Sequence, residues 1–201
     1  MAIKVANNQS LTAITALPTA VSGSAMNLLE TQTASSSATI SFTNNIDSTY
    51  DEYVFKFYDI HPETDGAYLT FQADTGTNSD YNETITSTFF YVQHDEASSG
   101  PALAYATTRD LAQGTGVQFF TDSAGNGSDE SAAGELHLFA PSSTTFVKHF
   151  YSRTSTYYTS NYAFDVFVAG YANTTSAVNA VQFSVESGGN FDGVIKMYGV
   201  S

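Results

Sequence analysis

The sequence has no cysteine and no tryptophan, and only 4 of its 201 residues are proline. The absence of cysteine excludes disulfides, thiolate metal ligands and a cysteine nucleophile. It also argues against a small secreted module that depends on disulfides for its stability. A chain of this length needs no cross-links, because folding buries roughly 70% of the surface that its unfolded form exposes. The length suits one large domain, or one domain with a short arm.

Positive charge is also scarce. Six Lys or Arg residues stand against 20 Asp or Glu residues, which gives a formal net charge of -14. Such a chain repels phosphate backbones, so we expect no nucleic-acid partner. Anionic lipid surfaces repel it as well, and no run approaches the roughly 20 apolar residues of a membrane helix, so we expect no membrane partner. The start of the chain lacks a continuous apolar stretch, which predicts that there is no signal peptide.

Aromatic residues are plentiful, with 15 Phe and 13 Tyr, and from residue 38 onward apolar residues recur at every second position. This alternation is typical of half-buried strands, and Gly, Pro, Asn, Asp and Ser gather between the runs. About ten such runs predict an all-β, antiparallel, jelly-roll-like β-sandwich. A helical turn is expected only at 109–113, and no helices alternate with the strands as in a parallel sheet. The expected strands are 38–42, 53–57, 67–73, 84–93, 102–107, 117–120, 136–140, 146–153, 164–171, 178–186 and 194–199.

Residues 1–36 differ from the rest of the chain. They contain no aromatic residue and many small ones, and the linker-like string Ala-Ser-Ser-Ser occupies 34–37. We therefore predict an N-terminal arm and linker at 1–36 and a β-sandwich domain at 37–201. Roughly the first 30 residues are expected to order against a partner or a neighbouring subunit, with a short helix at 25–29. A frayed terminus is the alternative.

Enzyme signatures are absent from the sequence. It contains no Gly-x-Ser-x-Gly elbow, no Gly-x4-Gly-Lys phosphate loop and no His-Glu-x-x-His helix. Paired carboxylates for glycoside cleavage cannot be located, because 20 acidic residues always offer pairs and their separation is not encoded in the sequence. We predict no catalytic residues, no cofactor and no enzymatic activity.

The four histidines are not expected to form a metal site. If residues 141–144 form a four-residue hairpin loop, Leu136 lies opposite His149 and His137 lies opposite Lys148. His137 and His149 then point to opposite faces of the sheet, because successive strand residues alternate. The other two histidines stand next to turns, so we expect all four to be solvated or bonded locally.

One acidic loop could hold a hard cation. Calcium takes six to eight oxygen ligands from carboxylates, amides and carbonyls, and Asp122, Asn126, Asp129 and Glu130 could supply several of them. The spacing does not match the twelve-residue calcium loop between two helices. Since Gly, Asn, Ser and Asp are also ordinary turn residues, turn formation is the first interpretation and the calcium loop is a weak candidate.

Tyrosines form the second candidate site. Tyr157, Tyr158 and Tyr162 lie in or near the polar stretch 152–161. Exposed tyrosine offers rigid amphipathic area for protein or sugar contacts. We therefore predict an exposed contact loop at 152–161, with these three residues as binding residues. The alternative is that the rings lie across a sheet face and pack there.

Six segments of the sequence carry a resemblance, and they occupy 34–42, 46–57, 81–88, 141–149, 168–175 and 193–199. They resemble small β-structured virion proteins of tailed bacteriophages, especially aquatic ones. The resemblance covers most of the chain. It lies in the general residue pattern and in these short segments, and it includes no catalytic motif. It implies a capsid decoration or cement protein, a head fibre or a tail-fibre component. It further implies a homo-oligomer, a trimer, that contacts other virion proteins such as major capsid or tail proteins. The protein would be located in the virion after assembly in the host bacterial cytoplasm.

Three functions follow from these observations. The first is a non-enzymatic phage structural protein that docks by its N-terminal arm and displays its β domain. The second is a receptor- or carbohydrate-binding tail-fibre module whose tyrosines hold a host-surface glycan. The third and most remote is a polysaccharide depolymerase, which needs acidic residues that converge in a cleft.

Overall fold

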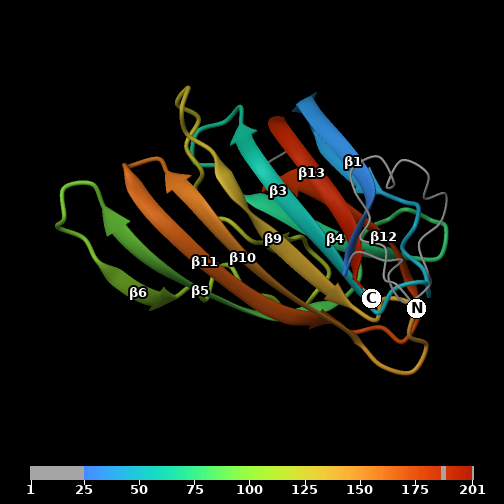
Figure 1. Ribbon diagram of the computed structural model, residues 1–201. Helices are drawn as coiled ribbons and strands as arrows, with labels where there is room; N and C mark the ends of the chain where they lie inside the picture. Colours follow the sequence, from blue (N-terminus) through green and yellow to red (C-terminus); the bar gives the residue numbers. More distant parts are fainter. Residues whose placement is uncertain (1–24, 187–188, 201) are drawn as a thin grey trace, which may run out of the picture.

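The computed structural model describes residues 25–186 and 189–200 of the chain. These residues form thirteen strands in two antiparallel sheets and contain no α-helix. The two sheets pack face to face, so the prediction of an antiparallel β-sandwich is confirmed, while its jelly-roll character stays a prediction. The larger sheet runs across Figure 1 from β1 at the upper right to β6 at the lower left, and the smaller sheet lies behind it.

The strand order of each sheet defines the architecture. The large sheet follows the order β1, β13, β3, β9, β10, β11, β5, β6, and β7 also pairs with β5. The small sheet follows the order β2, β12, β4, β8. The strands of the large sheet are β1 (Met26–Ser37), β3 (Glu52–Pro62), β5 (Ile85–Asp95), β6 (Ala102–Tyr105), β7 (Ala112–Gly114), β9 (Ala132–Phe139), β10 (Lys148–Tyr158), β11 (Tyr162–Ala172) and β13 (Phe191–Val200). Those of the small sheet are β2 (Thr39–Phe42), β4 (Leu69–Thr75), β8 (Gln118–Phe119) and β12 (Val178–Val185).

The hydrophobic core lies between the sheets and is rich in phenylalanine. Phe183 of β12 is fully buried at its centre. Its ring packs at centroid distances of 5.3–6.0 Å on the rings of Phe42, Phe55, Phe57 and Phe120. These contacts join both sheets and the segment after β8, so one side chain links three parts of the fold.

Strict alternation along β10 shows how the large sheet uses its two faces. Every second residue from Lys148 to Thr156 is buried, and the residues between them are exposed. One face therefore packs on the core, which we call the inner face, and the outer face is open to solvent. Lys148 on the inner face donates hydrogen bonds to the backbone carbonyls of Phe146 and Thr174, whereas the buried hydroxyls of Ser152 and Thr156 have no partner among the described residues.

The segment predicted to be an arm belongs to the sheet from residue 26 onward. Strand β1 pairs with β13 from the Met26–Val200 pair to the Ser37–Phe191 pair. The short helix expected at 25–29 is therefore wrong, and so is the linker at 34–37, where Ala34 is buried. Strand β13 presents unpaired backbone N–H and C=O groups at its edge. Another strand can pair with these groups through its own backbone, so the small polar side chains of β1 do not prevent it from joining the sheet. Residues 1–24 lie outside the described residues, so an anchoring role for them stays a prediction.

Two local predictions also change. Residues 109–113 form no helical turn: a turn closes with the Arg109 N–H donating to Ala106 O, and the chain then enters β7.

The loop between β9 and β10 is longer than four residues, so His137 pairs with Tyr151 instead of Lys148. A shift of three positions reverses the face of every residue. His137 and His149 consequently share the outer face, where the His137 imidazole stacks on the Tyr151 ring at 4.3 Å and its Nδ1 bonds to Glu52.

Candidate functional site

The tyrosine-rich segment is a tight hairpin instead of a contact loop. Strand β10 pairs with β11 up to the Tyr158–Tyr162 pair, and the Asn161 N–H donates to Tyr158 O across the turn. The exposed loop predicted at 152–161 is therefore wrong for most of its length. Ser and Thr residues of this segment fit the strand because β9 and β11 satisfy its backbone on both sides.

Strand alternation divides the three predicted tyrosines between two faces. Tyr157 lies on the outer face, where it borders a hollow. Tyr158 lies on the inner face, where it borders a second cleft together with Tyr162. Tyr162 also borders the outer hollow. The Tyr158 and Tyr162 rings meet edge to face at a centroid distance of 6.0 Å. The structure thus brings two of the predicted residues together and places Tyr157 on the opposite side of the sheet.

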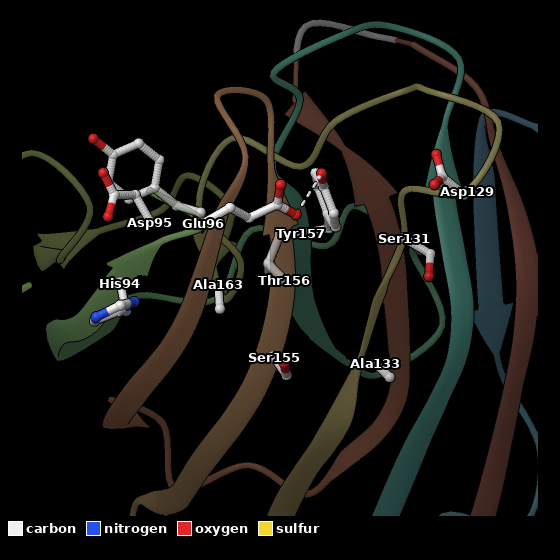
Figure 2. Close-up of a pocket in the computed structure, with 11 residues that line it drawn as sticks. His94, Asp95, Glu96, Asp129, Ser131, Ala133, Ser155, Thr156, Tyr157 and Ala163 are labelled. Carbon is white, nitrogen blue, oxygen red and sulfur yellow. Dashed lines mark hydrogen bonds between the residues drawn. The ribbon is translucent and has the colours of Figure 1, made fainter. Parts of the chain in front are cut away.

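The outer hollow, with a volume of about 560 Å³, lies over small side chains of neighbouring strands. Figure 2 shows Ala133, Ser155 and Ala163 along its floor, with His94 on one side and Asp129 on the other. The Tyr157 hydroxyl donates to Glu96 Oε1 at 3.2 Å. Burial, reinforced by Glu96, raises the pKa of Tyr157, so this phenol stays protonated.

A buried carboxylate closes the turn beside the outer hollow. Asp95 accepts hydrogen bonds from the hydroxyl and N–H of Ser99 and from the N–H of Gly100. These bonds, led by the one from the Ser99 hydroxyl, lower the pKa of Asp95. Asp95 is therefore ionised at neutral pH and holds residues 96–100 in place next to β11.

The turn at Asp95 should make stability depend on pH. Because the pKa is lowered on folding, the stabilising contribution is present above the ordinary carboxyl pKa of about 3.9 and disappears as the pH falls through the lowered value. We expect Asp95→Ala to lower the melting temperature at pH 7, and the gap from the wild type to shrink steadily below about pH 4. Thermal unfolding followed by circular dichroism across this range measures the gap. A gap that stays constant with pH would show that Asp95 does not act through its charge.

The inner cleft is the second concavity, with a volume of about 430 Å³. It opens between the ends of three strands of the large sheet and the segments around residues 68, 109 and 122. Its lining combines phenol, amide, hydroxyl, guanidinium and carboxyl groups. The residues that line it are Tyr68, Tyr91, Gln93, Arg109, Asp122, Ser123, Tyr158, Ser160, Tyr162 and Phe164.

One wall of the inner cleft is a stack of aromatic rings from adjacent strands. Phe164 of β11 lies between Tyr91 of β5 and Tyr158 of β10, with centroid distances of 5.0 and 4.5 Å. Stacked rings cover each other's faces and leave their edges and hydroxyls toward the cleft. In the described part of the chain, no other residue forms a hydrogen bond with the hydroxyls of Tyr91, Tyr158 and Tyr162, so these groups are free to bind a ligand.

The opposite wall carries the charged groups. The Arg109 guanidinium lies 4.2 Å from the centre of the Tyr68 ring and donates through Nη2 to the Tyr68 hydroxyl, which also accepts from Ser123 Oγ at 2.8 Å. Asp122 is 8% exposed. Its burial raises the pKa of this carboxyl, and the charge of Arg109 opposes the rise only in part.

The predicted calcium ligands do not come together. Asp122 lines the inner cleft, while Asp129 borders the outer hollow. Glu130 accepts the N–H of Gly127 at 2.7 Å, and the Asn126 amide donates to a backbone carbonyl of a neighbouring loop. Residues 25–186 and 189–200 contain no group of three or more His, Asp or Glu side chains that could hold a metal ion. The loop residues fold onto their own backbone and neighbours, as turn residues do, so the structure gives the calcium loop no support.

Sequence reasoning overlooked three polar residues of the inner cleft, Tyr68, Gln93 and Arg109. For Arg109 the available signal was the scarcity of basic residues. The chain has six Lys or Arg residues, so each of them could have been considered as a candidate for a specific role. Gln93 carried no comparable signal, since it occupies an ordinary position of strand β5.

A third feature is an exposed apolar patch at the free edge of the large sheet. We call it the edge patch: Phe90 and Val92 of β5 with Leu103 and Tyr105 of β6. Pairing places Phe90 opposite Tyr105 and Val92 opposite Leu103, so all four side chains share the outer face. Leu103 is 72% exposed, more than any other large hydrophobic residue described, and Tyr105 is 51% exposed.

Comparison with known proteins adds no assignment. No protein-family model, curated protein or solved structure matches the chain. Within the described residues, no helix is long and apolar enough to cross a membrane. The functional interpretation therefore depends on the geometry of the three surfaces described above.

Proposed function

We propose that the chain is a non-enzymatic structural protein displayed on the surface of a phage particle, where it forms a homo-oligomer and contacts other virion proteins. The resemblance of its sequence to virion proteins of tailed phages supports the setting. The edge patch is the observation that carries the proposal of assembly, because Leu103 and Tyr105 are far more exposed than side chains of their kind in the sheet interior.

Edge strands with exposed apolar residues favour association, and monomeric proteins usually protect them with Lys, Pro or a covering loop. Strand β6 forms one end of the large sheet and has the sequence Ala-Leu-Ala-Tyr, which contains neither Lys nor Pro. It is also uncharged in a chain of net charge -14. Two copies can therefore meet at β6 with less of the repulsion that opposes contact between their other surfaces, although the Asp110 carboxylate accepts a hydrogen bond from the Tyr105 hydroxyl of the patch.

Leu103→Lys tests the assembly. If Leu103 is buried in the contact between two copies, its burial stabilises the oligomer by about 1.5–3 kcal/mol. A lysine in its place loses this contribution, so the substitution should weaken association at least about tenfold. Sedimentation velocity of the full chain over a concentration series measures the effect. Val117→Lys is the matched control, since Val117 is an exposed apolar residue outside the edge patch, and this variant should associate like the wild type.

Two outcomes would contradict this proposal. One is a wild-type chain that stays monomeric throughout the concentration series. The other is an oligomer that Leu103→Lys leaves unchanged. Electron cryo-microscopy of particles tests the location separately: density on the capsid lattice indicates a decoration protein or head fibre, density on the tail indicates host recognition, and absence from the particle refutes the virion role.

The second candidate is a receptor- or carbohydrate-binding module. The inner cleft favours it, because stacked rings with free hydroxyls lie opposite a buried carboxyl. A depolymerase receives less support from this cleft. Most glycoside hydrolases use two carboxyl groups, whereas Asp122 contributes the one carboxyl group among the residues that line the inner cleft.

A further inference from the structure

The geometry points to a binding site for one residue of a neutral saccharide in the inner cleft, with Asp122 and Gln93 as the principal hydrogen-bonding residues. This inference develops the second candidate function and does not depend on the oligomeric state. The ligand class follows from the donors and acceptors in the cleft, from its charge and from its size.

The charge of the cleft excludes anionic ligands. A phosphate or carboxylate group needs several free cationic or N–H donors. Arg109 is the one basic residue that lines the cleft, and its guanidinium already lies on the ring and hydroxyl of Tyr68. The Asp122 carboxylate next to it would repel an anion, as would the overall charge of -14.

The walls favour a polar ligand over a purely apolar one. Phe164 lies between the rings of Tyr91 and Tyr158, so both of its faces are covered, and the tyrosines add their hydroxyls to the cleft. A polyhydroxylated ring suits such a wall, because each phenol can both donate to and accept from a sugar hydroxyl.

Asp122 provides the strongest reason for a hydrogen-donating ligand. A carboxylate that is 8% exposed is costly unless donors satisfy it, and its local donor is Ser123, the next residue in the chain, whose hydrogen bonds lower the pKa of Asp122 less than burial raises it. Sugar hydroxyls would supply charge-assisted hydrogen bonds to its free oxygen lone pairs. Removal of this charge should stabilise the free protein, because burial raises the pKa of Asp122 and the ionised form therefore opposes folding at neutral pH.

The polar groups of the cleft are held in place before any ligand binds. The Gln93 amide nitrogen donates to Gly100 O at 3.2 Å, which leaves its oxygen as an acceptor for a ligand. Arg109 is fixed through its backbone carbonyl, which accepts from Gln118 Nε2 at 3.0 Å. A volume of about 430 Å³ lies in the range of roughly 300–1,000 Å³ that is typical of small-ligand sites. It suits one sugar unit, such as a terminal or branching unit of a glycan.

Ligand-observed NMR on the full chain tests the site, with glucose, galactose, mannose and N-acetylglucosamine as neutral probes and glucuronic acid as the acidic probe. We expect at least one neutral sugar to bind with a dissociation constant near the millimolar range, and glucuronic acid not to bind. Asp122→Asn should weaken that binding by about 10- to 100-fold, since a hydrogen bond to a charged group is lost. The same variant should melt at or above the wild-type temperature.

The matched control is Asp129→Asn, which removes an equal charge at the outer hollow and should bind as the wild type does. Gln93→Leu supplies a second cleft variant that should also lose binding. The inference is overturned if no neutral sugar binds, if only glucuronic acid binds, or if Asp122→Asn and Asp129→Asn behave alike. Leu103→Lys should retain sugar binding, so failure of the assembly proposal and failure of this one are distinguishable.

Discussion

Phe183→Ala is expected to lower the free energy of unfolding by about 3–5 kcal/mol, which is the usual cost of removing a fully buried phenylalanine. Its ring packs on four other phenylalanine rings drawn from both sheets and the segment after β8. These rings are held by paired strands of both sheets, so we expect them to collapse only in part into the space that the side chain leaves. The variant therefore loses both transfer free energy and packing contacts.

Urea unfolding of the full chain, followed by tyrosine fluorescence and circular dichroism, measures this loss. Phe146→Ala is the control, because Phe146 is 71% exposed and its replacement should change stability by no more than about 0.5 kcal/mol. If Phe183→Ala cost less than about 1 kcal/mol, the two sheets would not depend on this side chain for their packing.

Gln118→Leu is the second change with a large expected effect. Gln118 is fully buried, and its Nε2 donates to the backbone carbonyls of Arg109 and Phe119 while its Oε1 accepts from Ser87 Oγ. Leucine has a similar volume but leaves these three groups without their partner. An unsatisfied buried group costs about 1–3 kcal/mol, so we expect a loss of about 2–4 kcal/mol in the free energy of unfolding.

The same substitution should affect sugar binding, because Gln118 holds the backbone of Arg109 beside the inner cleft. Comparison of Gln118→Leu with Gln113→Leu separates the two effects, since Gln113 forms its hydrogen bonds at the exposed surface of β7. We expect Gln113→Leu to unfold and bind almost as the wild type does. A fully stable Gln118→Leu protein would indicate that water satisfies the three groups and that Gln118 does not position Arg109.

Strand β5 connects the two proposed surfaces. Phe90 and Val92 point to the outer face and belong to the edge patch, while Tyr91 and Gln93 point to the inner face and line the inner cleft. An oligomer formed through the edge patch would therefore leave the inner faces of its subunits available for a ligand. A displayed structural protein and a glycan-binding module are compatible roles for one chain.

The sequence by itself determined the fold class and the position of most strands. Alternating apolar residues predicted strands at 84–93 and 178–186, and the structure has β5 and β12 there. Alternation reports which face of a sheet a residue occupies, and this is a local property. The same logic fails for β1, whose small polar residues look like a linker, because their strand conformation comes from the backbone of β13.

Pairings and sites were decided only by the tertiary structure. A loop between β9 and β10 that is longer than predicted moved His137 opposite Tyr151 and so reversed its face. The consecutive residues Tyr157 and Tyr158 were separated by the sheet itself. Asp122 was interpreted as part of a calcium loop, yet it lies with Arg109 and Tyr68 in the inner cleft. These residues are distant in sequence, and they meet because the segments that carry them come together at the inner face of the large sheet. Packing and hydrogen bonds between distant segments set their positions, so no local sequence pattern predicts them.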